Sequence, residues 1–234
     1  MRKKGDKDSF WPSYVDIVTT LFAIMVVLFA VSYSRFRVKE RELRKIVDKY
    51  EEIKKIYQTV ENIDPTYFEF DSTYVKHIFK IQVTYQKGEF DLYKLMVDRA
   101  NKMAADSLRE RIIAAGQEIQ KTVRNLQNMH DKKQDIKYLV VIEGQASADG
   151  YYINPYFNND VLSYQRALAL HQFWRKNGID FSSMLKCELV ICGSGEGGVP
   201  RDTTREEFNQ RFLIHIVPVI GNIRMDNSQK AHSF

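Results

Sequence analysis

Residues 10–33 read FWPSYVDIVTTLFAIMVVLFAVSY, and Asp16 is the one charged side chain in this stretch. An α-helix rises 1.5 Å per residue, so 24 residues reach about 36 Å and can cross a hydrocarbon core of roughly 30 Å. Trp11 and Tyr14 near one end and Tyr33 at the other carry rings that favour the membrane interface. The stretch therefore predicts one transmembrane helix over residues 10–33.

A cleaved signal peptide is the alternative for this segment. Arg2, Lys3 and Lys4 precede the apolar run, and residues 30–32 (AVS) resemble a small-residue cleavage site. The run is, however, longer than the usual apolar region of about 7–15 residues, and it contains Asp16. We therefore expect the segment to remain as a membrane anchor.

The charges beside the apolar stretch bear on its orientation. Residues 1–10 carry four Lys and Arg, whereas residues 34–50 carry seven. Counted by the positive-inside rule, this distribution places the C-terminal side in the cytoplasm. The first family resemblance described below implies the opposite orientation, and we adopt that one.

Asp16 is costly inside a membrane. An aspartate at the centre of a spanning helix costs about 2.5–3.5 kcal/mol, and Asp16 lies roughly 9 Å into the helix. It is either a carboxylate that reaches towards the interface or a carrier of protons or ions, and a carrier must be shielded by helices of a partner or of a second copy. The hydroxyls of Thr19 and Thr20, within about one turn, either bond a hydrated ion or bond their own backbone.

Trp11, Tyr14, Asp16 and Thr19 stand at the spacing W-x-x-Y-x-D-[FL]-[MV]-T. The sequence here resembles the stator B subunits of ion-driven rotary motors, the family of flagellar MotB and of the Zorya anti-phage ZorB. The resemblance implies that Asp16 carries H⁺ or Na⁺, supported by Tyr14, Thr19 and Thr20. It also implies an N-terminal tail (1–9) in the cytoplasm, a periplasmic C-terminal domain, and two B copies inside a ring of five MotA- or ZorA-like A subunits in the inner membrane.

Residues 34–64 contain neither Gly nor Pro and predict a continuous helix. Apolar residues recur at heptad spacing, with Lys39 at one seam position and charged residues on the other faces. The apolar seam consists of Phe36, Leu43, Ile46, Tyr50, Ile53, Tyr57 and Val60. This pattern predicts a coiled-coil linker in a homodimer. The alternative is an amphipathic helix docked on its own domain, because two seam tyrosines weaken a tight dimer.

Residues 65–221 alternate between strand and helix patterns, and residues 222–234 form a polar tail. We expect strands over 77–85, 138–144, 185–193 and 211–219, and helices over 93–130 and 162–176. This βαβαβ order predicts an α+β domain with a small mixed sheet that helices cover on one face.

The helix opening near residue 160 carries a second resemblance. Asn159, Leu162, Ser163, Arg166 and Ala167 match the N-x-x-L-S-x-x-R-A pattern of OmpA-like peptidoglycan-binding domains. The GSGE stretch (193–196) and the NQR stretch (209–211) are similar to later elements of that family. The resemblance implies a wall-binding site made of Ser147, Asn159, Leu162, Arg166, Asn209 and Arg211. Wall peptides carry carboxylates, which suit an arginine near a helix N-terminus.

Two positions depart from the OmpA-like pattern. The family commonly has G-H-T-D where this chain has GQAS (144–147), so Ser147 replaces the Asp that recognises the amine of diaminopimelate. Asp149 lies nearby in the sequence, and Gln210 replaces the first Arg of N-R-R. The serine, together with a helix that starts directly after the membrane, is more like the Zorya type than the flagellar type. We therefore favour anti-phage defence over a flagellar role.

The composition argues against several function classes. A net charge of +5 over 234 residues is too small for a nucleic-acid footprint, so we expect no direct nucleic-acid partner. The five histidines and two cysteines form no metal or catalytic spacing, and the GSGEGG stretch lacks the Lys-Ser/Thr of a P-loop. We expect no enzyme activity and no cofactor beyond the transported ion. A passive wall anchor, or an adhesion or signalling protein that uses the coiled coil, is the rival interpretation.

Overall fold

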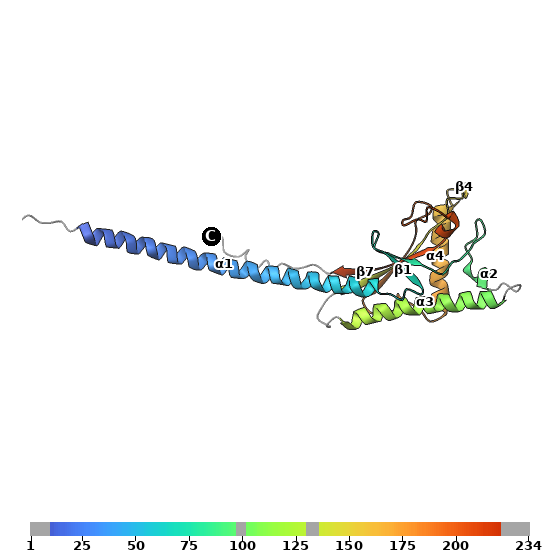
Figure 1. The fold of residues 1–234 in the computed structure, drawn as a ribbon, viewed down its shortest axis with the longest axis horizontal. Helices are drawn as coiled ribbons and strands as arrows, with labels where there is room; N and C mark the ends of the chain where they lie inside the picture. The colour runs from blue at the N-terminus through green and yellow to red at the C-terminus, as the bar shows by residue number, and fades with distance from the viewer. Residues whose placement is uncertain (1–9, 97–101, 130–135, 221–234) are drawn as a thin grey trace, which may run out of the picture. The chain divides into compact units, whose positions relative to one another are not determined.

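A computed structural model describes residues 10–96, 102–129 and 136–220 (Figure 1). The described residues divide into two compact units, one that ends at Glu52 and one that begins at Ile53. The chain combines a long N-terminal apolar helix with a domain of mixed sheet and helices. The predicted α+β fold class is confirmed.

The first helix, α1, runs without a break from Phe10 to Glu61. Every side chain from Trp11 to Lys39 is exposed. Among the described residues, α1 is the one helix long and apolar enough to cross a membrane. Such a helix gains nothing from burial inside its own chain, so its apolar surface needs lipid or other helices.

The last turns of α1 belong to the core of the second unit. Ile56 and Val60 are almost completely buried, as is Ile63 just beyond the helix, and His77 Nε2 lies 2.8 Å from the Val60 carbonyl oxygen. Packing therefore begins before residue 65, where we expected the domain to start. In these last turns, α1 is an amphipathic helix docked on its own domain, which was the alternative to the coiled coil.

The earlier seam residues of α1 remain exposed in the single chain. They are Phe36, Leu43, Ile46 and Tyr50. A coiled coil over this part of the helix stays a prediction.

The second unit is built on a five-stranded sheet in the order β1-β2-β7-β3-β6. Its strands are β1 (Phe68–Asp71), β2 (Lys76–Phe79), β3 (Ile136–Gly144), β6 (Cys187–Gly193) and β7 (Phe212–Ile220). β3 and β6 are parallel, and the other neighbours are antiparallel. A separate hairpin pairs β4 (Tyr152–Asn154) with β5 (Phe157–Asn158).

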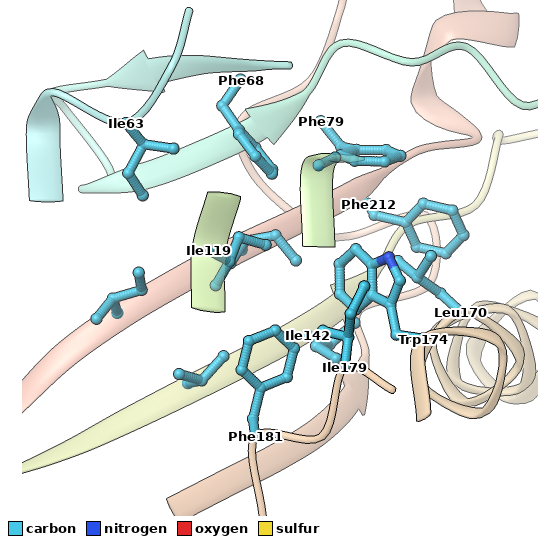
Figure 2. Close-up of a cluster of buried hydrophobic side chains, with 14 of the residues drawn as sticks. Ile63, Phe68, Phe79, Ile119, Ile142, Leu170, Trp174, Ile179, Phe181 and Phe212 are labelled. Atoms are coloured by element: carbon cyan, nitrogen blue, oxygen red, sulfur yellow. The ribbon is translucent and has the colours of Figure 1, made fainter. Parts of the chain in front are cut away.

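Two long helices, α3 (Lys102–Met129) and α4 (Asn159–Lys176), pack with the sheet around one core. The shorter elements are α2 (Leu92–Met96) and the 3₁₀ turn η1 (Glu206–Asn209). Trp174 lies in the centre of the core, among Phe79, Ile142 and Phe181 (Figure 2). Its Nε1 donates to the Ile112 carbonyl at 2.8 Å, and a Cβ at Gly116 would lie 2.6 Å from that nitrogen. From Ile214 to Val219 the side chains of β7 alternate between buried and more exposed, and the buried ones join the core that the helices cover, as predicted.

The strand expected over 77–85 is wrong in its extent. β2 ends at Phe79, although Ile81, Val83 and Tyr85 continue the alternation and are buried. The partner strand explains the early end. β7 pairs Ile214 with His77 and begins at Phe212, so residues 80–85 have no strand residue of β7 opposite them. A buried alternating pattern therefore did not require ladder hydrogen bonds.

Two other expectations also need correction. The helix expected over 93–130 is two helices, α2 and α3, with residues 97–101 outside the described part of the chain. β1 was not predicted, because four residues (FEFD) give too short a pattern. The expected polar tail (222–234) and N-terminal tail (1–9) lie outside the described residues.

On the face of the sheet that points away from the core, Glu143 forms a buried ionic group. Its carboxylate accepts from Lys76 Nζ at 2.9 Å and from His215 Nε2 at 2.8 Å. Burial alone would raise the pKa of Glu143, but hydrogen bonds from His215, Ser194 and Lys76 outweigh this effect and lower that pKa to about 2. The charged form of Glu143 therefore favours the folded state.

We expect Glu143→Gln to lower the stability of the full chain at pH 7 by about 3 kcal/mol, because Lys76 loses its buried counter-charge. The folded pKa lies below the ordinary value of 4.5, so the stabilisation is complete above about pH 4.5 and is lost as the pH falls towards 2. Thermal unfolding followed by circular dichroism at pH 7, 4 and 3 measures this. The control is Glu188→Gln, an exposed acid paired with Lys137 at 3.6 Å. Equal effects of the two variants at pH 7 would contradict the assignment.

Candidate functional site

Asp16 lies on the exposed surface of α1, in the part without other charges. A shallow open hollow on this surface is lined by Trp11, Ser13 and Thr19 together with Asp16. The Trp11 and Tyr14 rings stack with their centroids 5.9 Å apart. The carboxylate and the two interfacial rings therefore occupy adjacent turns of one helix.

Both threonine hydroxyls bond the backbone of their own helix. Thr19 Oγ1 donates to the Val15 carbonyl and Thr20 Oγ1 donates to the Asp16 carbonyl, each at 2.8 Å. Of the two alternatives for these hydroxyls, the single chain adopts the backbone bond. Their oxygen lone pairs remain as acceptors, so a role beside an ion stays a prediction.

The second group of candidate residues gathers where α4 begins. Asn158 caps the helix, its Oδ1 accepting from the Val161 amide at 3.0 Å. The helix lies so close to the end of β3 that a Cβ at Gly144 would come within 2.0 Å of the Ser163 carbonyl oxygen. This close approach brings Asn159 next to the loop that follows β3.

Arg166 is buried, with 2% of its surface exposed. Its Nε donates to the Glu89 carbonyl at 3.0 Å, and its guanidinium carbon lies 4.3 Å from the centre of the Tyr85 ring. Burial lowers the pKa of Arg166, but a guanidinium stays charged in proteins. Its Nη1 is buried and has no hydrogen-bond partner among the described residues. The site therefore holds a cation with an unused donor.

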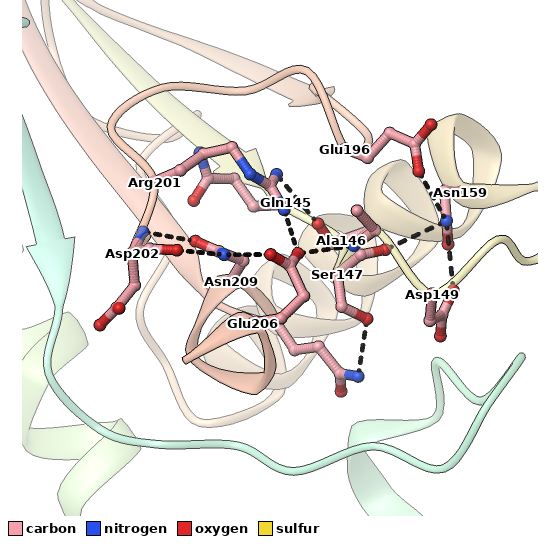
Figure 3. Close-up of polar contacts among 12 residues, drawn as sticks. Gln145, Ala146, Ser147, Asp149, Asn159, Glu196, Arg201, Asp202, Glu206 and Asn209 are labelled. Carbon is pink, nitrogen blue, oxygen red and sulfur yellow. Dashed lines mark hydrogen bonds and ion pairs between the residues drawn. The ribbon is translucent and has the colours of Figure 1, made fainter. Parts of the chain in front are cut away.

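Asn159 connects three segments (Figure 3). Its Nδ2 lies 3.1 Å from the Ser147 carbonyl, 3.3 Å from Asp149 Oδ1 and 3.5 Å from Glu196 Oε2. Its Oδ1 is buried and unpartnered within the described part of the chain. Two carboxylates therefore stand beside the start of α4, on loops that follow β3 and β6.

The two departures from the OmpA-like pattern contact each other. Gln210 Nε2 donates to Ser147 Oγ at 3.0 Å, and Gln210 Oε1 accepts from the Tyr85 amide at 3.2 Å. Ser147 and Gln210 thus form a neutral hydrogen bond at the two positions where the OmpA-like pattern has an aspartate and an arginine. The replacements are complementary.

Asn209 and Arg211 hold the loop around residues 200–202. Asn209 Oδ1 accepts from the Asp202 amide at 2.8 Å, and its Nδ2 donates to the Asp202 carbonyl at 3.0 Å. Arg211 donates to Gln145 Oε1 at 3.0 Å and to the Pro200 carbonyl at 2.7 Å. These contacts are internal, so both residues support the site in this structure.

The remaining expected residue, Leu162, is a buried residue of α4 with 3% of its surface exposed. Sequence reasoning missed Tyr85 and Glu89, which cover Arg166. Glu89 lies 77 residues before Arg166 in the sequence. They belong to no motif, and only the alternation around Tyr85 marks it as buried. Neither residue could be connected to Arg166 from the sequence.

We expect Ser147→Asp alone to destabilise the chain by about 2 kcal/mol, because it places a carboxylate where Ser147 is 5% exposed. Adding Gln210→Arg supplies a counter-charge and should recover at least half of the loss, a coupling typical of contacting residues. Chemical denaturation of the four chains of this cycle measures the coupling. Additive effects would show that the two positions do not interact.

No family model and no curated protein sequence matches this chain. A solved MotB-like protein from Desulfovibrio vulgaris is 14% identical, with a TM-score of 0.38 over 73% of this chain and 94% of that one. An OmpA-like domain from Francisella tularensis is 15% identical (TM-score 0.33; 65% and 79% covered). The periplasmic domain of Helicobacter pylori MotB is 10% identical (TM-score 0.34; 71% and 99% covered).

Proposed function

We propose that this chain is the B-type subunit of an ion-driven membrane motor, anchored to the cell wall by its C-terminal domain. The observation that carries the proposal is Asp16, the one charged side chain in the apolar stretch of α1, where the helix surface is fully exposed. A lipid-facing carboxylate is unstable, so the helix needs partners that bury it. Burial then couples its protonation to access to water on either side.

The exposed seam of α1 supports a homodimer, and the resemblance of residues 11–19 to stator B subunits supports the A-type partners. Two copies can bury the seam residues Phe36, Leu43, Ile46 and Tyr50 against each other directly after the membrane. We propose a dimer surrounded by five MotA- or ZorA-like A subunits, which shield Asp16 and turn as the ion passes. In this arrangement the chain crosses the inner membrane once, with its N-terminus in the cytoplasm and its C-terminal domain in the periplasm.

The site at the start of α4 suits a wall peptide, which carries carboxylates and free amines. Arg166 Nη1 can donate to a carboxylate, and Asp149 and Glu196 can accept from an ammonium group. Because Glu89 and Tyr85 cover Arg166, the segment that carries them must move to admit the peptide. We propose peptidoglycan as the ligand.

We propose Zorya-type anti-phage defence as the setting of this motor. The Ser147–Gln210 pair and the helix that continues from the membrane segment support this choice over a flagellar stator. The identity of the gene product encoded beside this chain distinguishes the two.

Asp16→Asn should abolish ion flux while leaving assembly intact, because the amide keeps the shape but cannot exchange a proton. Co-purification with the adjacent gene product checks assembly, and pH or Na⁺ uptake by proteoliposomes containing both proteins measures flux. We expect at least a tenfold loss. Asp48→Asn is the matched control, an acid on α1 outside the apolar stretch. Full flux in Asp16→Asn would contradict the role of Asp16 as the ion carrier, whereas no flux and no co-purifying partner for the unaltered chain would support a passive wall anchor.

Arg166→Gln should weaken retention of the full chain by purified peptidoglycan sacculi about 10- to 100-fold, the value of one charge-assisted hydrogen bond. Arg175→Gln, on the exposed last turn of α4, is the control and should bind normally. Thermal unfolding of both variants separates lost binding from lost folding. Unchanged retention by a folded Arg166→Gln variant would exclude this site.

A further inference from the structure

The β4–β5 hairpin exposes four large apolar side chains within six residues, here named the hairpin patch. It consists of Tyr152 (66% exposed), Ile153 (67%), Tyr156 (78%) and Phe157 (52%). Tyr156 is the most exposed aromatic side chain among the described residues. A concentration of exposed apolar side chains beside polar groups is typical of a binding surface.

Side-chain hydrogen bonds fix the hairpin in place. The Tyr151 amide donates to Asp149 Oδ1 at 3.0 Å, and the Tyr156 amide donates to Asn154 Oδ1 at 2.8 Å. Asn158 Nδ2 donates to the Pro155 carbonyl at 3.0 Å. A two-stranded hairpin is marginal by itself, and such Asx turns stabilise it. The backbone that carries the rings is therefore held in position before a ligand arrives, which lowers the entropy cost of binding.

The chemistry of the hairpin indicates the kind of ligand. Residues 150–159 (GYYINPYFNN) contain no charged side chain but three tyrosines, one phenylalanine and three asparagines. Aromatic faces stack on the C–H face of a pyranose ring, while phenol hydroxyls bond sugar hydroxyl and N-acetyl groups. A membrane surface would favour basic residues beside the rings, and this segment has none. The composition fits a neutral glycan.

The hairpin is continuous with the candidate wall site. It connects Asp149 directly to Asn159, and β4 lies near the start of α4 in Figure 1. Lys87 Nζ donates to the Asp149 carbonyl at 3.2 Å, and the Tyr151 ring packs against Gly88, where a Cβ would lie 3.0 Å from it. A polymer whose peptide lies at Arg166 therefore has its sugar chain within reach of the hairpin.

We propose that the hairpin patch binds the sugar rings of a neutral glycan strand by stacking. This inference rests on the proposed wall-binding function and adds a second ligand group to it. The peptide is held at the Arg166 site and the glycan by the hairpin, and the two contacts reinforce each other because they are connected.

The test uses the full chain in detergent and a peptide-free oligomer of N-acetylglucosamine as the probe. Titration calorimetry should show binding that weakens at least fivefold in the double variant Tyr152→Ala, Tyr156→Ala, as loss of stacking predicts. Tyr156→Phe should bind normally, because the ring is kept. Tyr74→Ala is the matched control, an exposed tyrosine (45%) in the turn between β1 and β2.

Arg166→Gln separates the two proposals. It should bind the peptide-free oligomer like the unaltered chain while losing retention by sacculi; normal retention would count against the wall site alone. The hairpin inference is overturned if the unaltered chain does not bind the oligomer, or if the double variant binds it equally well.

Discussion

The contact between α4 and the end of β3 positions the whole candidate wall site. Gly144 leaves room for the Ser163 carbonyl, and a Cβ there would come within 2.0 Å of it. At the other end of α4, Trp174 inserts between the helices and donates to the Ile112 carbonyl. With both ends fixed, Asn159 and Arg166 have defined places relative to the loops after β3 and β6.

Buried polar groups give this site its chemical character. The Arg166 guanidinium lies over the Tyr85 ring, and its Nε donates to the Glu89 carbonyl. Its Nη1 has no hydrogen-bond partner among the described residues. An unpartnered buried donor costs free energy, and natural proteins keep such groups mostly where a ligand or water satisfies them. The Ser147–Gln210 bond is neutral, whereas Asp149 and Glu196 place two carboxylates beside Asn159.

Two exposed apolar surfaces lie outside the core of this chain, the surface of α1 and the hairpin patch. The surface of α1 is uniformly apolar over membrane length and carries one carboxylate, which suits helices and lipid. The hairpin patch is aromatic and uncharged, which suits sugars. Neither surface is explained by the folding of the single chain, because neither contributes to its core.

The sequence by itself determined the features that depend on local periodicity and composition. These are the apolar stretch with Asp16, the buried strand β3, the helix pattern over 162–176 and the α+β class, whereas the resemblance to OmpA-like domains marked Asn159 and Arg166 as site residues. It could not determine the end of β2 at Phe79, because that end depends on where β7 begins, more than 130 residues later. The covering of Arg166 by Tyr85 and Glu89, and the Ser147–Gln210 bond, were likewise decided by tertiary structure alone. Contacts between distant segments depend on the packing of the whole core, and no local pattern records them.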